Sequence, residues 1–205
     1  TANWKETFNG TDGILLRKAI CYALNRTEMV KGAFNGYALP AIDSMGFSLR
    51  RPDVPECCGK GYDYDIVKAK QLLDEAGWKD TDGDGVLDKN GKSLKDLDLV
   101  ITSASGLAWQ KDLALVVQSQ LKNIGIDVKI QTLDSSAYRK AMNDGEFDLG
   151  MTYNIGRGNS LSLELNKFNL KKQGAKTNLC DDQNGTLVTI KEKANKTTNK
   201  EERDK

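Results

Sequence analysis

The sequence of 205 residues contains no histidine. Histidine is the commonest general base and the commonest metal ligand in proteins. Its absence excludes a Ser-His-Asp or Cys-His catalytic arrangement within the chain, and it excludes zinc sites that depend on imidazole. Carboxylates could still do acid–base work, but no constellation stands out among the 29 acidic residues, so we expect the protein not to be an enzyme.

An excess of one charge and long apolar runs are also missing. Thirty basic residues balance 29 acidic ones to a formal charge of +1. This balance predicts no basic surface for nucleic acid or for an anionic membrane. No stretch approaches the roughly 20 apolar residues needed to span a bilayer. A composition of 39% hydrophobic and 29% charged residues is typical of an ordinary globular domain.

Cysteine is scarce, and no pair has the C-x-x-C spacing of a zinc ribbon or a thioredoxin-like motif. Cys21 lies in a helical apolar pattern and is expected to be a small core residue. Cys57 and Cys58 are neighbours in a predicted loop, and Cys180 is far along the chain. Their redox state is open: free thiols, one bridge to Cys180, or a contact with a soft metal.

All three prolines fall within residues 38 to 61, together with several glycines. This composition predicts a long loop, of a length that is often functional or wraps another domain. Outside it, apolar residues recur at helical spacing in five segments. We expect helices over residues 12–24, 27–34 with Thr27 as N-cap, 65–78, 109–124, and from Asp134 or Ser135 to about residue 144.

Three further segments have strand character, at residues 99–101, 126–132 and 147–153. With the helices between them they give the order β-α-β-α-β. This order predicts an α/β fold with right-handed crossovers, built on a small mixed sheet that helices flank.

The last predicted strand leads into a segment that contains Tyr153, Asn154 and Arg157 between glycines. Ligands of open α/β sheets bind beyond the carboxyl ends of the strands. An aromatic wall, an amide and a fixed charge at that place favour a ligand-facing edge. A plain surface turn explains the same residues equally well.

The acidic segment from residue 80 to 88 resembles the first nine positions of an EF-hand calcium loop. Asp80, Asp82, Asp84 and Asp88 occupy the ligand spacing, and Gly85 occupies the sixth position, where the chain must turn sharply. The twelfth position, however, is a glycine where a bidentate glutamate is expected. The alternatives are a weak structural calcium site and a solvated turn without an ion.

Several collinear segments within residues 8 to 160 resemble the family of periplasmic binding proteins for oligopeptides, dipeptides and nickel, the family 5 extracellular solute-binding proteins. Residues 16–26 read L-R-K-A-I-C-Y-A-L-N-R, which looks like that family's R-x-A-I-x-Y-A-I-N-R helix. Tyr64-Asp65 followed by residues 69–78, A-K-Q-L-L-D-E-A-G-W, matches its Y-D-x-x-K-A-K-x-L-L-x-E-A-G-W signature. Residues 121–128 and 138–148 are also similar to the family pattern.

The resemblance implies a two-lobed clamp that closes on a solute and delivers it to the membrane permease of an ABC importer. Family members are more than twice this length, and residues 1 to 5 have no signal-peptide character. We therefore expect residues 1–205 to be a single α/β lobe, lacking an N-terminal half and the extreme C-terminus. Residues 174–205 are expected to be a truncated, polar helical tail. The implied location is extracytoplasmic, in the periplasm or as a cell-surface lipoprotein, and the implied state is a monomer.

The resemblance leaves the solute open between a peptide and nickel or another metal chelate. The nickel branch carries a histidine in the strand that matches residues 147–153, where this chain has Thr152. Peptide binders tend to carry an acidic residue that pairs with the peptide amine, and residues 154–163 contain none. The expected ligand-binding residues are Tyr138, Thr152, Tyr153, Asn154 and Arg157, with Arg157 facing a ligand carboxylate. No cofactor is expected to be required, and a calcium-binding structural module built on residues 80–88 is the alternative function.

Overall fold

The computed structural model describes residues 6–8, 10–40, 61–152, 189, 192, 193 and 196. After residue 96, strands and helices alternate along the chain. They are η1 (Glu6–Phe8), α1 (Gly10–Ala23), α2 (Arg26–Phe34), α3 (Ile66–Glu75), β1 (Asp88–Lys89), β2 (Lys92–Ser93), β3 (Leu97–Thr102), α4 (Trp109–Lys122), β4 (Val128–Leu133), α5 (Ser135–Asp144) and β5 (Leu149–Gly150).

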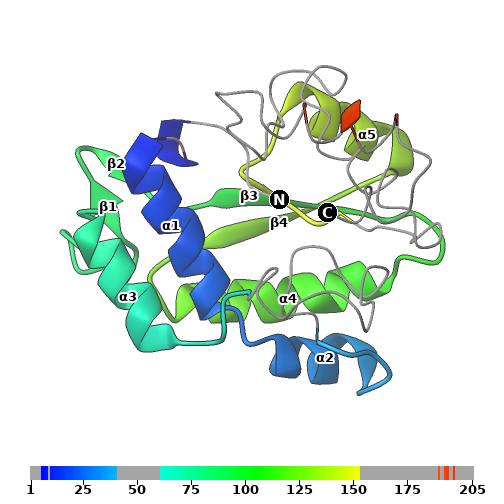
Figure 1. The fold of residues 1–205 in the computed structure, drawn as a ribbon, viewed down its shortest axis with the longest axis horizontal. Coiled ribbons are helices and arrows are strands. Elements are labelled where there is room, and N and C mark those ends of the chain that lie inside the picture. The colour runs from blue at the N-terminus through cyan, green and yellow to red at the C-terminus, as the bar shows by residue number, and fades with distance from the viewer. Residues whose placement is uncertain are drawn as a thin grey trace.

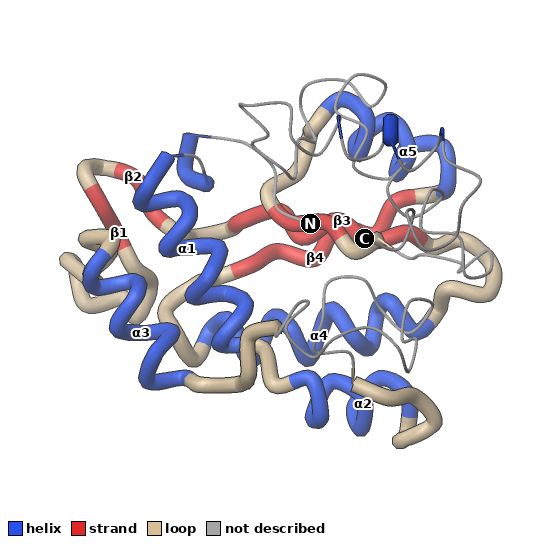
Figure 2. The backbone as a smooth tube through the Cα atoms, in the orientation of Figure 1, coloured by secondary structure: helices blue, strands red, loops and turns tan. Residues whose placement is uncertain are grey.

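The central sheet has the strand order β4-β3-β5, with helices on both of its faces (Figures 1 and 2). β3 pairs in parallel with both of its neighbours, with Leu97 opposite Val128 and Leu99 opposite Leu149. The α/β class and the β-α-β-α-β order are therefore confirmed. The prediction of a mixed sheet is wrong for the described strands of the central sheet, which pair in parallel; antiparallel pairing lies outside it, in the β1–β2 hairpin and at the bridge between Lys79 and Asp88.

Burial along the strands follows their place in the sheet. β3 lies in the middle, and five of its six residues are buried, so its sequence reads as an apolar run. β4 lies at an edge and is only partly buried: Val128 is buried, Lys129 and Thr132 are exposed, and its other residues are intermediate. The predicted alternation therefore does not continue along the whole strand.

β5 is shorter than the strand predicted over residues 147–153. The backbone N–H of Asp98 donates to the carboxylate of Asp148 at 2.9 Å, where a strand would offer a backbone carbonyl. The backbone N–H of Asp148 in turn donates to the carbonyl oxygen of Asp98 at 3.1 Å. The side chain thus replaces the first ladder hydrogen bond, and regular pairing is limited to Leu149 and Gly150.

The core extends from the sheet and α4 to the place where α1 and α3 pack together (Figure 1). α1 presents a stripe at helical spacing, of which Leu16 and Ala19 are fully buried, to the buried stripe of α3. Cys21 is half-buried rather than part of this core, and burial raises the pKa of its free thiol. Lys89 of the hairpin donates to the carbonyl oxygen of Ala76 and to the carboxylate of Asp12, which joins the hairpin to α3 and α1.

Three helix boundaries differ from their predicted places because of local capping. Asn25, not Thr27, is the N-cap of α2, and its side-chain oxygen accepts from the N–H of Glu28 at 3.2 Å. α3 ends at Glu75, because Gly77 adopts φ +81° and the N–H of Trp78 folds back onto the carbonyl of Leu73. α4 ends at Lys122, three residues before Gly125.

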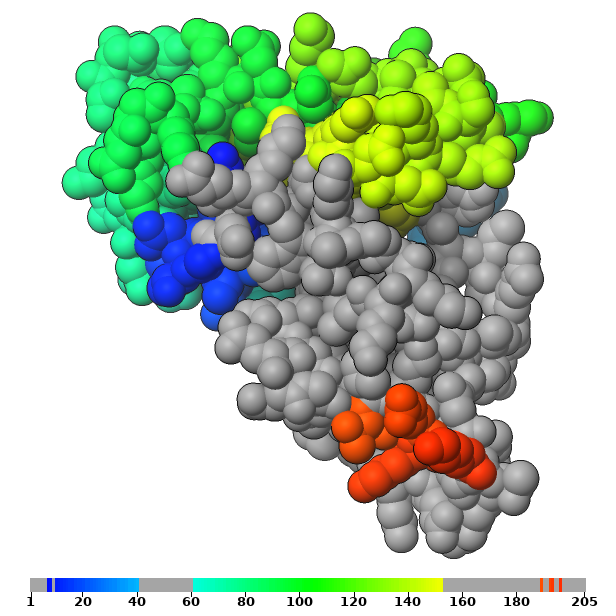
Figure 3. Space-filling view, turned by 90° about the horizontal axis from the view of Figure 1, so that it is seen from above, coloured from blue at the N-terminus to red at the C-terminus, as the bar shows by residue number. Residues whose placement is uncertain are grey.

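None of the described helices has the length and apolarity required to cross a bilayer. Seen from above, α5 and the residues near it form one flank of the described surface, and η1 with the start of α1 forms another (Figure 3). Residues 41–60, which include most of the predicted loop with Cys57 and Cys58, and Cys180 lie outside the described residues, as does almost all of the predicted tail over 174–205.

Candidate functional site

The carboxyl ends of the three parallel strands meet at one edge of the sheet. Thr102 lies opposite Leu133 in the register of β3 and β4. The N–H of Ser103 donates to the carbonyl of Leu133 at 2.8 Å, and the N–H of Met151 donates to the carbonyl of Val100 at 3.0 Å. The loops that leave the three strands therefore start side by side, which is where open α/β sheets bind ligands. We call these strand ends, with Ser103, Asp134 and Thr152, the carboxyl edge.

Tyr138 lies at the carboxyl edge because α5 starts directly after β4. Asp134 caps α5, its carboxylate accepting from the N–H groups of Ser136 at 2.8 Å and Ala137 at 3.0 Å. One turn later, the half-buried Tyr138 donates its hydroxyl to the carbonyl of Met151 at 2.6 Å. This bond holds the aromatic ring next to the chain that leaves β5.

The structure therefore brings two of the predicted ligand-binding residues to the same edge. Tyr138 contacts the backbone of Met151, and the next residue, Thr152, is exposed. Tyr153, Asn154 and Arg157 lie outside the described residues, so their ligand-binding role stays a prediction.

Gln110 is a polar residue of the carboxyl edge that the sequence analysis missed. It lies in the first turn of α4 and is fully buried, and its side-chain oxygen accepts from the N–H of Thr102 at 3.0 Å. Its Nε2 is buried and has no hydrogen-bond partner among the described residues. Gln110 stands four residues before Ala114 and seven before Val117 on the buried stripe of α4, and this polar interruption of an apolar stripe was the available signal.

Asp134 places a negative charge at the carboxyl edge. Hydrogen bonds from the N–H of Ala137 and from Ser136 hold the pKa of the Asp134 carboxyl below its ordinary value. This carboxylate is satisfied by the helix end that it caps, so it serves the placement of α5 rather than a ligand cation.

The four aspartates of the acidic turn lie at the far end of the molecule from the carboxyl edge, ahead of the first residue of β3. The carboxylates of Asp80, Asp82 and Asp88 each have an oxygen within 4.8 Å of the others. Both oxygens of Asp80 accept backbone N–H groups, from Gly83 at 2.7 Å and Gly85 at 3.0 Å. Carboxylate oxygens are the type of ligand that a hard cation such as calcium takes, but three carboxylates are fewer than the six to eight oxygens that calcium coordinates.

Asp84 does not join this group. Its carboxylate pairs with Lys95 at 2.7 Å and also accepts from the N–H of Val86. The hydrogen bond from Lys95, followed by that from Val86, lowers the pKa of Asp84, and the same pair raises the pKa of Lys95. The twelfth position of the loop, Gly91, lies with Asn90 in the left-handed turn of the β1–β2 hairpin, with φ +75° and +52°. That position therefore supplies no carboxylate.

Comparison with known protein families identifies the family of this chain. The profile of the bacterial extracellular solute-binding proteins, family 5 (middle region), matches residues 5–175. The chain belongs to this family. The expected resemblance is thereby confirmed over most of the chain.

Individual family 5 relatives agree with this result. The oligopeptide-binding protein AppA of Bacillus subtilis is 40% identical over 137 residues, which are 65% of this chain and 24% of that protein. The nickel-binding periplasmic protein of Escherichia coli is 30% identical over 141 residues, which are 68% of this chain and 25% of that protein. The matched segments thus span about a quarter of the length of these relatives.

Solved structures of family 5 proteins have the same fold. The structure of AppA from Bacillus subtilis in complex with a nonapeptide is 28% identical, with a TM-score of 0.72 over 98% of this chain and 38% of that one. NikA from Brucella suis in complex with Fe(III)-EDTA superposes with a TM-score of 0.73 at 24% identity, over 97% of this chain and 39% of that one. These likenesses confirm the periplasmic-binding-protein-like fold.

Proposed function

We propose that this chain forms part of the solute-capturing component of an ABC importer, which binds a peptide or a metal chelate outside the cytoplasm. The observation that carries the proposal is the family 5 match over residues 5–175 on a lobe whose parallel strands end at one edge. Capture by this mechanism is reversible binding without turnover, and it requires no cofactor.

Two named relatives support these ligand classes. AppA was solved with a nonapeptide, and NikA was solved with Fe(III)-EDTA. Both ligands carry carboxylates, which an arginine recognises through charge-assisted hydrogen bonds. In this proposal Arg157 faces the carboxylate, Tyr138 and Tyr153 provide aromatic walls, and Thr152 and Asn154 provide hydrogen bonds.

The partners follow from the same proposal. The loaded protein docks on the membrane permease of the importer and acts as a monomer in the periplasm or as a cell-surface lipoprotein. The near-neutral charge of the chain supports no role for nucleic acid.

Titration calorimetry tests the ligand class. The full-length protein that contains this chain is titrated with a nonapeptide, with nickel, with nickel-histidine and with Fe(III)-EDTA. We expect saturable heat for one class and a loss of at least about tenfold in affinity for Arg157→Ala, because a charge-assisted hydrogen bond contributes about 1.5–3 kcal/mol. Lys129→Ala on the exposed side of β4 is the matched control. Saturable heat for none of the ligands would remove this set of solutes.

A structural calcium ion at the acidic turn is a second candidate, favoured by the convergence of Asp80, Asp82 and Asp88. With three carboxylates, and with Gly91 where a bidentate glutamate is needed, binding should be weak, about millimolar. We expect calcium at that level to raise the melting temperature, and Asp82→Asn to abolish the rise. Asp96→Asn, an exposed aspartate outside the cluster, is the control. An equal melting temperature with calcium and with chelator would dismiss the ion.

A further inference from the structure

The central strand β3 parts from its two neighbours at different residues. On the β4 side, pairing runs to Thr102 opposite Leu133, and the N–H of Ser103 still donates to the carbonyl oxygen of Leu133 at 2.8 Å. On the β5 side, the last backbone hydrogen bond among the described residues runs from the N–H of Met151 to the carbonyl oxygen of Val100 at 3.0 Å. β5 therefore leaves the sheet while β3 and β4 are still paired.

The next hydrogen bond of the β3–β5 ladder would join Thr102 to Met151. In a parallel pair, a residue that donates its N–H to one residue of the neighbouring strand accepts, with its carbonyl, from the residue two further along. Met151 donates to Val100, so its carbonyl would accept from the N–H of Thr102. Thr102 is buried, and a buried N–H requires an acceptor.

Side chains occupy both atoms of this missing bond. The N–H of Thr102 donates to Oε1 of Gln110 at 3.0 Å. The carbonyl oxygen of Met151 accepts from the hydroxyl of Tyr138 at 2.6 Å. Both lengths are ordinary for their donor types. Each backbone group is thus satisfied by a side chain in place of the other strand.

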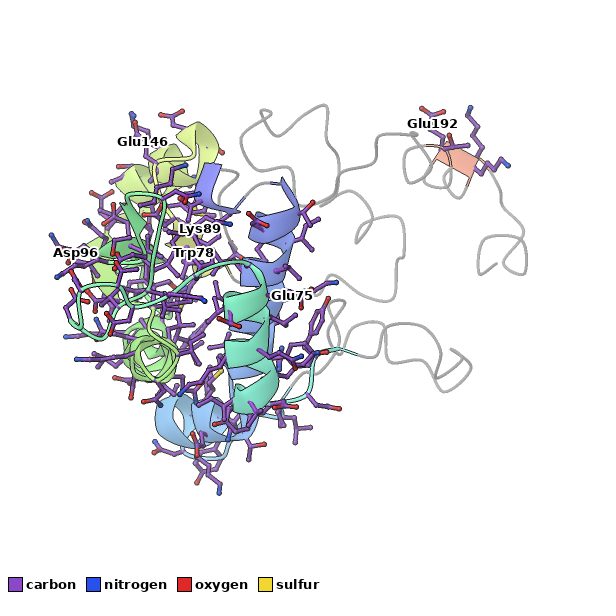
Figure 4. All side chains as sticks on the ribbon, turned by 90° about the vertical axis from the view of Figure 1, so that its left-hand side faces the viewer. Glu75, Trp78, Lys89, Asp96, Glu146 and Glu192 are labelled. Carbon is purple, nitrogen blue, oxygen red and sulfur yellow. The ribbon has the colours of Figure 1, made fainter. Side chains whose placement is uncertain are left out.

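The two side chains reach the strands from opposite faces of the sheet. Gln110 belongs to the first turn of α4 and Tyr138 to α5, and the sheet lies between these helices (Figure 1). The same layers can be followed from the side in Figure 4, where Glu146 lies just after the end of α5. Two separate helices each supply one partner, so the parting of the strands is not the product of a single local turn.

We propose that Gln110 and Tyr138 are positioning residues that part β5 from β3 and thereby direct the chain that follows Met151 at the carboxyl edge. Gln110 is fully buried, so it acts only through the backbone that it holds. The importance of this direction for binding rests on the proposed function, because the predicted ligand-binding residues from Thr152 onward follow directly.

Scalar couplings across hydrogen bonds, measured by NMR on the ¹³C,¹⁵N-labelled chain, test the parting of the strands. In the wild type, the amide nitrogen of Thr102 should couple to the side-chain carbonyl carbon of Gln110. Gln110→Met combined with Tyr138→Phe removes both side-chain partners, and Thr102 should then couple to the carbonyl carbon of Met151. A coupling between Thr102 and Met151 in the wild type, or its absence in the double variant, would overturn the proposal.

A double-mutant cycle followed by urea unfolding provides a second readout. Gln110→Met also removes the unpaired Nε2, and the cycle cancels that contribution. The unfolding constant of the double variant should be at least about threefold smaller than the two single effects multiplied together, because the freed groups pair with each other. Gln118→Met, whose native amide donates to Val128 instead, should combine with Tyr138→Phe without coupling. Independent effects of Gln110→Met and Tyr138→Phe would contradict the proposal.

Calorimetry on the full-length protein tests the consequence for binding. The double variant should bind the solute at least about threefold more weakly than Tyr138→Phe alone, since a displaced segment fits the ligand less well. Gln110 is buried, so this difference cannot come from a lost contact with the solute. Equal affinities would overturn the positioning role. If the wild type binds no solute, the proposed function fails, and the couplings of Thr102 still decide whether the two side chains part the strands.

Discussion

Gly125 and Gly106 have nearly the same backbone conformation in very different surroundings. Their φ angles are +79° and +82°. A Cβ at residue 125 would come within 2.6 Å of the Cγ of Leu87, whereas one at residue 106 would meet nothing within 4 Å. The pair therefore separates the cost of a left-handed backbone from the cost of a steric clash.

We predict that Gly106→Ala destabilises the fold by about 1 kcal/mol, which is the cost of the positive φ alone. Gly125→Ala should cost about 1–3 kcal/mol more, because the contact with Leu87 adds overpacking. Urea unfolding followed by circular dichroism measures both. Equal costs for the two variants would show that Leu87 does not pack on Gly125 as described.

Asp134 connects the carboxyl edge to the pH dependence of stability. Hydrogen bonds from Ala137 and Ser136 lower the pKa of the Asp134 carboxyl in the folded protein. The contribution of Asp134 to folding stability is therefore complete above the ordinary carboxyl pKa of 3.8, and it is lost as the pH falls through the lower folded pKa. Asp134→Ala should lower the melting temperature at pH 7, because α5 loses its cap. Asp134→Asn keeps an acceptor without the titration, so its stability should fall less steeply below about pH 4. Identical acid profiles for wild type and Asp134→Asn would contradict this role.

At the scale of elements, α2 depends on α4. α2 has no buried residue of its own. It contacts α4 at three successive places: Phe34 against Trp109 at 5.3 Å between ring centroids, Gly32 close to Val116, and Asn25 on Gln120. Its stability therefore comes from docking rather than from an apolar face of its own.

Gln120→Ala should release α2 from α4. The side chain of Gln120 accepts from the N–H of Asn25 at 3.0 Å and donates to the carboxylate of Glu28 at 3.3 Å. Removing this side chain leaves the N–H of Asn25 unpaired, which costs about 1–3 kcal/mol of stability. Hydrogen exchange should speed up in α2 and stay unchanged in β3. Gln118→Ala, whose amide donates to Val128 instead, is the matched control and should leave α2 protected. Unchanged exchange in α2 of Gln120→Ala would contradict this docking.

The elements could be predicted largely from the sequence because apolar periodicity and helix stops are local signals. Gly145 ends α5 in a left-handed conformation, as a glycine at that place predicts. The end of α3 is a local signal too, because Gly77 turns the chain and the N–H of Trp78 donates back to the carbonyl of Leu73. The short β5 depends on the tertiary hydrogen bonds of Asp148 with Asp98, which no local pattern contains. The EF-hand spacing likewise does not contain the ion pair of Asp84 with Lys95, which lies eleven residues further along the chain.

The candidate site could be predicted only in part. The position of Tyr138 and Thr152 at one edge follows from strand order, which the sequence does indicate. The buried amide of Gln110 became visible only once α4 was placed beside β3. Periodicity orders residues along one element, and it does not say which elements share a site.

At the scale of the whole molecule, the two ends of the parallel sheet carry different groups of side chains. The carboxyl edge presents Ser103, Asp134 and Thr152, where three loops begin together. The opposite end carries the acidic turn. A family 5 lobe that captures solute at the carboxyl edge should therefore respond to that solute at one end only.

Mapping amide chemical shifts during a solute titration tests this claim most directly. The ¹⁵N-labelled chain is titrated with the solute that gives saturable heat in calorimetry, and the shifts of described amides at both ends are compared. The account predicts shifts at Ser103, Tyr138 and Thr152, with Asp74 and Asn90 unmoved. Shifts that gather around Asp74 and Asn90 and leave the strand ends unmoved would contradict it.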